Sequence, residues 1–371
     1  MSSVISSLTA KREGTRPNNV ESVILWNWGG GTVDMSDFFT RYRFPKLRHL
    51  KLTRCAISSW NHLTSRTGAL TVLSLNFPSP TPTMSQLLSI IASNPLLQDV
   101  TLSSQAIPQN DGSPPSARVP LHNLKKLELA GGLRDVFRLL HQLDHPIRMD
   151  SLRLTLDNCK VAEISQIIGP HLRGYLRDRG RSRHELGLLI SPGNSIILHV
   201  DGERRTDWPL VRIDTFLLIM VRLDRSHRNE GERATLDLIA HIPGEDIVHF
   251  ETFGSLVTTE NICSWFPNLR TITFERARLQ TIFPEPDQGR DEDTLLSLQR
   301  MCFRGLVVDH GNWRPLITFL ACRISSGNRL DTLEVCHRHP MSREVIEVVR
   351  GMVRELIVKE SGPPDVAATD T

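Results

Sequence analysis

A short phrase of alternating leucines recurs along this chain and constrains the fold more than any other feature. Its clearest copy covers residues 47–57, with Leu47, Leu50 and Leu52 at its first, fourth and sixth positions. Alternation of apolar and polar residues is typical of a strand with one buried face. A strand this short buries little apolar surface, so it must stack on similar neighbours to form a continuous core. We therefore expect further copies along the chain.

Further copies do occur, at a nearly constant spacing. In the first half of the chain their first positions lie 27, 23, 27, 27 and 27 residues apart. A spacing of about 20 to 29 residues is typical of repeats that each add one strand to a shared core. A second block of copies is less regular. The first positions are residues 20, 47, 70, 97, 124 and 151 in the first block and residues 247, 269, 298, 330 and 353 in the second.

The hydrophobic period changes between the phrases, which predicts a helix after many of the strands. The clearest case is Thr83 followed by Gln86, the pattern of a capping box, and we expect this helix to stop at Asn94 before Pro95. Strands and helices therefore alternate, which indicates the α/β class. Apolar residues with helical spacing recur at residues 136–143, 164–168, 316–320 and 345–352, the last after a Ser342 cap.

The phrase at residues 47–57 fits the leucine-rich-repeat consensus L-x-x-L-x-L-x-x-(N/C)-x-L. Over residues 20–358 the chain resembles the F-box/leucine-rich-repeat-like proteins of basidiomycete fungi. In that family an N-terminal F-box docks a Skp-type adaptor of a cullin ubiquitin ligase, and the repeats select the protein to be marked. The resemblance is carried by residues 44–52, 57–60, 82–88, 93–95, 119–121, 124–127, 266–270 and 313–316.

The resemblance covers the repeat region, and we find no F-box. Val20 already starts a repeat, and residues 1–19 lack the Leu-Pro opening of an F-box. We therefore expect a module similar to the substrate-recognition repeats of an F-box adaptor, and we do not expect a Skp-type adaptor among its partners. The alternative is that the sequence is a truncated gene model of a complete F-box adaptor.

The repeats predict one leucine-rich-repeat-like solenoid of the α/β class, with a curved parallel sheet on its concave side and helices on its convex side. We expect residues 20–360 to form this domain, between a flexible segment, residues 1–19, and a disordered tail, residues 361–371. Regular repeats fill residues 20–165, degenerate central repeats fill 166–246, and the second block fills 247–360. The central repeats are inferred from strand-like runs at residues 186–190, 196–200, 216–221 and 236–239.

Composition narrows the class of partner and the compartment. The chain has 44 Lys and Arg against 41 Asp and Glu, a near balance that argues against a dedicated phosphate-binding surface. The longest clear apolar run, residues 216–221, is far shorter than the roughly 20 residues of a membrane span. Residues 1–14 contain no apolar stretch of signal-peptide length. We expect an intracellular protein, cytoplasmic or nuclear, with no membrane partner.

The sequence contains no pattern that predicts an enzyme. It lacks the G-x-S-x-G and H-E-x-x-H motifs and any kinase or deaminase signature. Six cysteines lie far apart without a C-x-x-C pair, so we expect neither a zinc site nor a disulfide framework, and no cofactor. Cys55 and Cys159 occupy the consensus position of a small buried side chain. The densest group of possible metal ligands, residues 336–339, is interpreted as a surface turn.

The repeat instead predicts a recognition surface. If the leucines point inward, the side chains at the third, fifth and seventh positions point to the concave face. We expect this face to bind a protein partner of unknown identity, with Trp26 and the pair Arg300 and Arg304 as anchors. Alternatively, Trp26 caps the open end of the core. The candidate partner-binding residues are Trp26, His49, Lys51, Asn76, Asp99, Lys126, Glu128, Glu275, Arg300, Arg304 and Glu334.

A cluster of arginines in the centre of the chain leaves RNA binding as a further alternative. Acidic residues interrupt the cluster, and Tyr175 is its one aromatic residue. A nucleic-acid platform needs more stacking residues, so we do not expect nucleic acid as a partner. The cluster consists of Arg173, Arg177, Arg179, Arg181 and Arg183.

Overall fold

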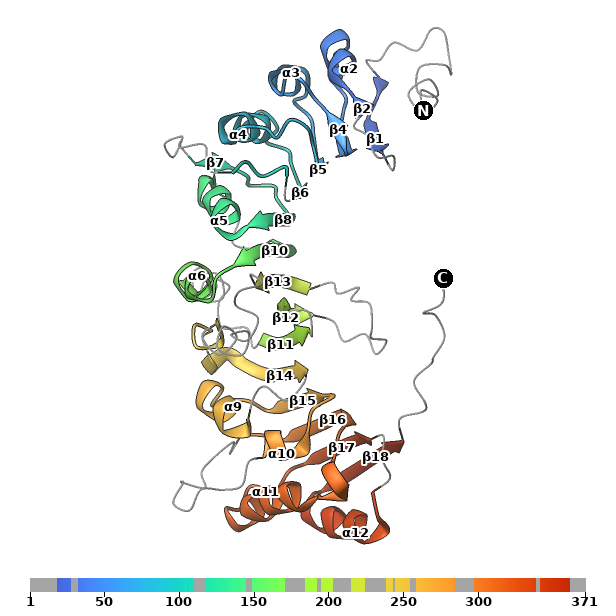
Figure 1. Cartoon of the computed structure of the whole chain (residues 1–371), viewed down its shortest axis with the longest axis vertical. Helices are drawn as coiled ribbons and strands as arrows, with labels where there is room; N and C mark the ends of the chain where they lie inside the picture. The colour runs from blue at the N-terminus through green and yellow to red at the C-terminus, as the bar shows by residue number, and fades with distance from the viewer. Residues whose placement is uncertain are drawn as a thin grey trace. The chain divides into compact units, whose positions relative to one another are not determined.

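The computed structural model shows a mixed α/β chain that divides into two compact units between Asn158 and Cys159 (Figure 1). We call them the N-terminal unit and the C-terminal unit. Among the described residues, no helix has both the length and the apolar character that crossing a membrane requires. The described residues are 19–27, 33–103, 105–109, 118–144, 149–170, 184–191, 195–202, 215–223, 238–242, 244–253, 258–283, 297–337 and 341–360.

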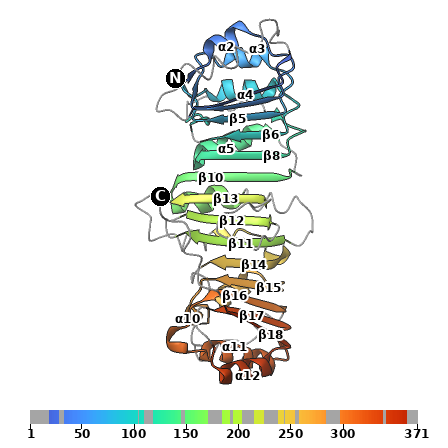
Figure 2. The ribbon, with the colours of Figure 1, turned by 90° about the vertical axis from the view of Figure 1, so that its right-hand side faces the viewer.

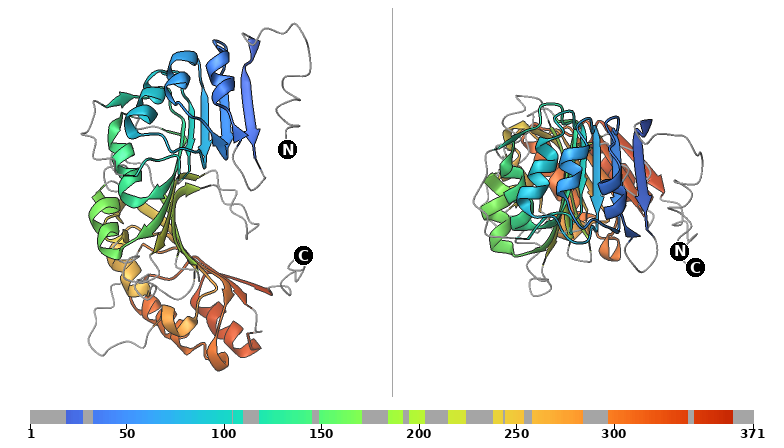
Figure 3. Two further views of the ribbon diagram at one scale, coloured as in Figure 1. Left: turned by 45° about the horizontal axis from the view of Figure 1, so that its top comes forward. Right: turned by 90° about the horizontal axis from the view of Figure 1, so that it is seen from above.

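The N-terminal unit contains a parallel sheet with helices on one of its faces (Figure 3). Its strands, in spatial order, are β1 (Ser22–Trp26), β3 (His49–Thr53), β5 (Val72–Asn76), β6 (Asp99–Leu102), β8 (Lys126–Gly132) and β10 (Ser151–Cys159). The helices are α2 (Ser36–Arg41), α3 (Asn61–Arg66), α4 (Met84–Ala92) and α5 (Leu133–Gln142). Two short parallel pairs join β2 (Val33–Asp34) to β4 (Cys55–Ala56) and β7 (Val119–Pro120) to β9 (Leu143–Asp144).

The repeated leucines form the core of the N-terminal unit. From β1 to β8 the strand register aligns equal positions of successive phrases, so the fourth positions make one row across the sheet and the sixth positions make another. In β10 the pairing is offset by two residues, so the second and fourth positions of its phrase continue these two rows. Burying each such side chain contributes about 1.5 to 3 kcal/mol. Cys55 and Cys159 are buried, as predicted. The fourth-position row is Val23, Leu50, Leu73, Val100 and Leu127, continued by Leu152, and the sixth-position row is Leu25, Leu52, Leu75, Leu102 and Leu129, continued by Leu154, all buried.

Helix α4 confirms the capping box that the sequence predicts. The Thr83 hydroxyl accepts a hydrogen bond from the Gln86 backbone N–H at 3.2 Å, and Gln86 Oε1 accepts one from the Thr83 N–H at 2.9 Å. The helix ends at Ala92, just before the predicted stop at Asn94. Its apolar side chains pack into the core, which explains why this short helix is stable in its context.

One backbone feature recurs directly after the strands. Five residues at the eighth position of their phrases have a positive φ, between 49° and 65°. This left-handed conformation is costly for residues other than glycine, so its recurrence indicates that the chain turns in the same way after each of these strands. The five residues are Arg54, Phe77, Asn158, Arg276 and Gly305.

The strands of the C-terminal unit pair mostly in parallel (Figure 2). Its strands, in spatial order, are β13 (Thr215–Leu223), β12 (Ser195–Gly202), β11 (His184–Ser191), β14 (Ile247–Phe253), β15 (Thr271–Glu275), β16 (Arg300–Leu306), β17 (Thr332–His337) and β18 (Glu355–Glu360). Its helices are α6 (Val161–Glu163), continued by the π-helix η2 (Ile164–Ile168), then η4 (Gly244–Asp246), α9 (Thr259–Trp265), α10 (Leu279–Ile282), η5 (Asp309–Gly311), α11 (Arg314–Ser325) and α12 (Arg343–Met352).

The central strands differ from the degenerate repeats that the sequence suggested. β11 pairs with β12, and β12 with β13, in antiparallel orientation, whereas repeats of one path would place all strands parallel. Only residues 192–194 separate β11 from β12, and a parallel connection needs a dozen residues or more. The fourth expected strand is also wrong in its described part, because Leu238 and Ile239 are helical.

The core of the C-terminal unit contains more aromatic residues than the leucine-rich core of the N-terminal unit. Phe274 and Phe303 are neighbours in the register of β15 and β16, and their rings stack with centroids 5.5 Å apart. The predicted helices are present, with the Ser342 hydroxyl accepting a hydrogen bond from the Val345 N–H at the start of α12 and Gly327 at φ 76° after α11. The helices of this unit lie on one face of its strands (Figure 3).

Candidate functional site

In each unit the strands have one face without helices, formed by the third, fifth and seventh positions of the phrases, which we call the open face of that unit. In the N-terminal unit the register arranges these positions in rows that cross the strands. All seven candidates of this unit lie on its open face. The third-position row is Ser22, His49, Val72, Asp99 and Lys126, continued by Ser151, the fifth is Ile24, Lys51, Ser74, Thr101 and Glu128, continued by Arg153, and the seventh begins with Trp26, Thr53 and Asn76.

Strand β1 gives this open face an apolar end. Trp26 is 60% exposed and Ile24 is 50% exposed, while Val23 and Leu25 of the same strand point into the core. The alternative that Trp26 caps the core is therefore wrong, because its side chain lies on the opposite face. An exposed aromatic side chain on a face that also carries charged residues of both signs, here Lys51 and Glu128, is typical of a protein-binding surface.

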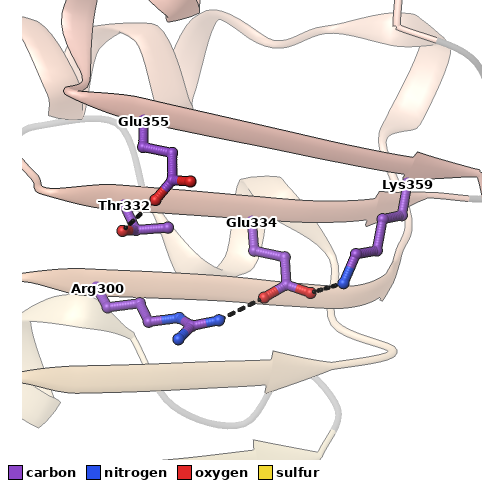
Figure 4. A network of polar contacts seen from close by, with 5 residues as sticks. All are labelled: Arg300, Thr332, Glu334, Glu355 and Lys359. Atoms are coloured by element: carbon purple, nitrogen blue, oxygen red, sulfur yellow. Dashed lines mark hydrogen bonds and ion pairs between the residues drawn. The ribbon is translucent and has the colours of Figure 1, made fainter.

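The open face of the C-terminal unit carries a network centred on Glu334 (Figure 4). Arg300 on β16 donates to Glu334 Oε2 at 2.8 Å, and Lys359 on β18 donates to Oε1 at 2.8 Å. Thr332 donates to Glu355 beside them at 3.2 Å. The hydrogen bonds from Lys359 and Arg300 lower the pKa of Glu334 to about 2, against the effect of its burial. The network therefore joins three adjacent strands through one buried carboxylate.

We expect Glu334→Gln to destabilise the protein by about 2 kcal/mol at pH 7. This loss of stability is smaller than the lowered pKa alone implies, because Arg300 and Lys359 are about half exposed and solvent weakens their attraction to the carboxylate. The folded-state pKa lies below the ordinary value of 4.5, so the stabilisation is complete above pH 4.5 and is lost as the pH falls toward 2. Urea unfolding of both proteins at pH 7 and pH 3.5 measures this difference.

The matched control for this prediction is Glu347→Gln. Glu347 accepts from Arg350 at 2.7 Å on α12, but both side chains are about 60% exposed. We expect a loss below about 0.5 kcal/mol there, as for other exposed ion pairs. An equal loss for Glu334→Gln at pH 7 and pH 3.5 would contradict the assigned role of the carboxylate.

A second charged group lies beside this network. Arg304 Nη1 is 3.5 Å from Glu251 Oε1, across the intervening strand β15. Burial, followed by the nearby Glu251 carboxylate, raises the pKa of Glu275. Burial, followed by the nearby Glu334, raises the pKa of the Cys302 thiol to about 11. Cys302 is thus protonated at neutral pH, and it has none of the thiolate character of a nucleophilic cysteine.

The four candidates of the C-terminal unit all lie on its open face, but their states differ from the prediction. Arg300 and Arg304, expected as anchors for a partner, are each paired with a glutamate of their own unit. Glu334 is buried between its two cations, so it supports the surface and is not a free contact.

The prediction missed two residues that complete these pairs, Glu251 and Lys359. They occupy the fifth position of the phrase that starts at residue 247 and the seventh position of the phrase that starts at residue 353. Applying the alternation rule to these two phrases would have found both.

Neither the alternative RNA site nor the histidine-rich turn can be placed completely. The five central arginines, from Arg173 to Arg183, lie outside the described residues, as do residues 338–340. Cys336 and His337 belong to β17. Within the described ranges, no group of three or more His, Cys, Asp or Glu side chains is arranged to hold a metal ion.

Comparison of the sequence with protein-family models finds no matching family, and comparison with curated proteins finds no match. The function must therefore be argued from the open faces themselves.

Proposed function

We propose that this chain is a noncatalytic interaction module of the leucine-rich-repeat type, whose open faces bind a protein partner. The observation that carries the proposal is the register from β1 to β8, which aligns third, fifth and seventh positions into rows of mostly polar and mostly exposed or half-exposed side chains, while the fourth and sixth positions form the core. The left-handed turn that recurs at five eighth positions supports a repeated unit. Stacked units of this kind extend a binding surface by one strand at a time.

The composition of the open face favours a protein over a nucleic acid as the partner. In the N-terminal unit, Lys51 and Lys126 alternate with Asp99 and Glu128 across the strands, and Trp26 stands at the end. A nucleic-acid surface would carry one dominant positive charge. The resemblance to the substrate-recognition repeats of F-box adaptors fits the same proposal.

Affinity purification of the tagged chain, quantified by mass spectrometry, tests this function with a pair of matched variants. Lys51→Glu/Lys126→Glu reverses two charges on the open face, and Arg43→Glu/Arg134→Glu makes the same change in net charge on the α2–β3 connection and on α5. We expect a partner that the wild type and the control retain and that the open-face variant loses by about tenfold or more.

Equal recovery of every co-purifying protein with both double variants would contradict the proposal. Recovery of a Skp-type adaptor would link the chain to a cullin ubiquitin ligase, against the expectation from the sequence.

A further inference from the structure

Two carboxylates share one arginine on the open face of the C-terminal unit. In the strand register, Arg304 is the direct neighbour of Glu275, and its guanidinium also reaches Glu251 on β14 at 3.5 Å. This distance is at the long limit of a hydrogen bond. Glu334, on β17 of the same open face, shows the opposite arrangement, with one carboxylate held at 2.8 Å by each of two cations. The Glu251 and Glu275 pair is therefore held less closely by cations than Glu334 is.

The pKa of Glu275 supports this imbalance. Burial and Glu251 raise the pKa, and Arg304 and Arg276 lower it, but the resulting pKa remains above its ordinary value. The cations of the chain thus stabilise this carboxylate incompletely, and a further cation beside it would be favourable.

A buried threonine neighbours both glutamates in the sheet, because it lies opposite Glu251 and two residues before Glu275. Thr273 is 1% exposed, on β15 beside Glu251 in the register, and its Oγ1 has no hydrogen-bond partner among the described residues. Buried polar groups are nearly always hydrogen-bonded, and leaving one without a partner costs about 1 to 3 kcal/mol. The hydroxyl is therefore an acceptor that a bound donor could satisfy.

We propose that Glu251, Thr273 and Glu275 form a subsite that binds the ammonium group of a lysine side chain of the partner protein. An ammonium has three donors and no acceptor, which matches two carboxylates and one hydroxyl oxygen. Admitting the ammonium requires the Arg304 side chain to move aside; this side chain is 36% exposed and lies at the long limit of hydrogen-bond distance from Glu251. The proposal rests on the proposed function of the open face and names one feature of the partner.

The probe for this subsite is N-acetyl-lysine methylamide, titrated into the full chain labelled with ¹³C at its threonine methyl groups. We expect a saturable shift of the Thr273 methyl resonance with millimolar affinity, typical of a single exposed ion contact. Glu251→Gln and Glu275→Gln should each weaken this affinity by about threefold to tenfold. N-acetyl-norleucine methylamide, which lacks the charge, should give no saturable shift.

Glu355→Gln is the matched control, because Glu355 lies on the same open face but bonds to Thr332 on the far strand pair. The affinity of the Glu355→Gln variant for the probe should equal that of the wild type. The resonances of the other threonine methyl groups report whether each variant is folded. The subsite would be overturned by an unchanged affinity in both glutamine variants, by an equal shift with norleucine, or by no saturable shift. Such a result would not contradict the proposed function if partner capture still depends on Lys51 and Lys126. Failure of the subsite and failure of the proposed function are therefore distinguishable.

Discussion

Phe303→Ala is expected to destabilise the protein by about 3 to 5 kcal/mol, the largest effect that the structure predicts. Phe303 is fully buried, its ring stacks on Phe274, and the edge of Phe283 meets it with centroids 6.2 Å apart. Truncation to alanine removes these contacts and leaves a cavity between strands that the register holds in place. Urea unfolding followed by circular dichroism measures the loss.

Two further variants separate packing from simple loss of a hydrophobic residue. Phe303→Leu keeps most of the buried volume and should cost less than about 1.5 kcal/mol. Ile324→Ala removes an apolar side chain that is 42% exposed on α11, and should cost less than about 0.5 kcal/mol. Comparable losses of stability for Phe303→Ala and Ile324→Ala would show that Phe274, Phe283 and Phe303 do not form a packed core.

Asn94→Ala is expected to cost about 3 kcal/mol, although asparagine is a polar residue at a helix end. Asn94 is fully buried after α4, accepts a hydrogen bond from the Leu70 N–H at 3.2 Å, and donates to Ile90 O at 2.8 Å and to Thr67 Oγ1 at 3.3 Å. Alanine would leave these buried groups without partners. Thermal unfolding and urea unfolding both report this loss.

The control for Asn94 is Asn123→Ala in the same unit. Asn123 is exposed and donates one hydrogen bond, to Pro95 O at 3.0 Å, so its loss should cost less than about 1 kcal/mol. Similar stability of the two alanine variants would contradict the role of Asn94.

Asn94 also belongs to a second repeated position of the sequence, which lies outside the pattern of leucines. It lies three residues before the first position of its phrase, and Thr67 lies at the same place in the preceding phrase, so their hydrogen bond joins equivalent sites of successive copies. The same place holds a buried apolar side chain in other copies, namely Phe44, Leu121 and Phe266.

Local patterns predicted most of the individual elements. The alternation of residues located the strands of both blocks, and Thr83, Gln86 and Ser342 located helix starts, because strand faces and caps depend on residues close in sequence. The direction of strand pairing depends on distant residues and on connection length. The antiparallel arrangement of β11, β12 and β13 was therefore missed.

For the candidate surface, too, local features were predicted from the sequence and long-range contacts were not. Alternation predicted which side chains share the open face, from Trp26 to Lys126, because each strand has a period of two. It could not predict that Arg304 pairs with Glu251, which lies 53 residues earlier in the chain and two strands away. Charge pairing across strands is decided by register and by burial, and both appear only when the strands are assembled.

Site-specific photo-cross-linking tests most directly the claim that the open faces are the recognition surface. A benzoylphenylalanine placed at Thr101, at the centre of the open face of the N-terminal unit, is compared with one placed at Ser89 on the exposed side of α4. After irradiation in extract from cells that make this protein, we expect the Thr101 variant to form a covalent complex with one partner and the Ser89 variant to form none. A complex from Ser89 with none from Thr101 would place recognition on the helices and contradict the proposed function.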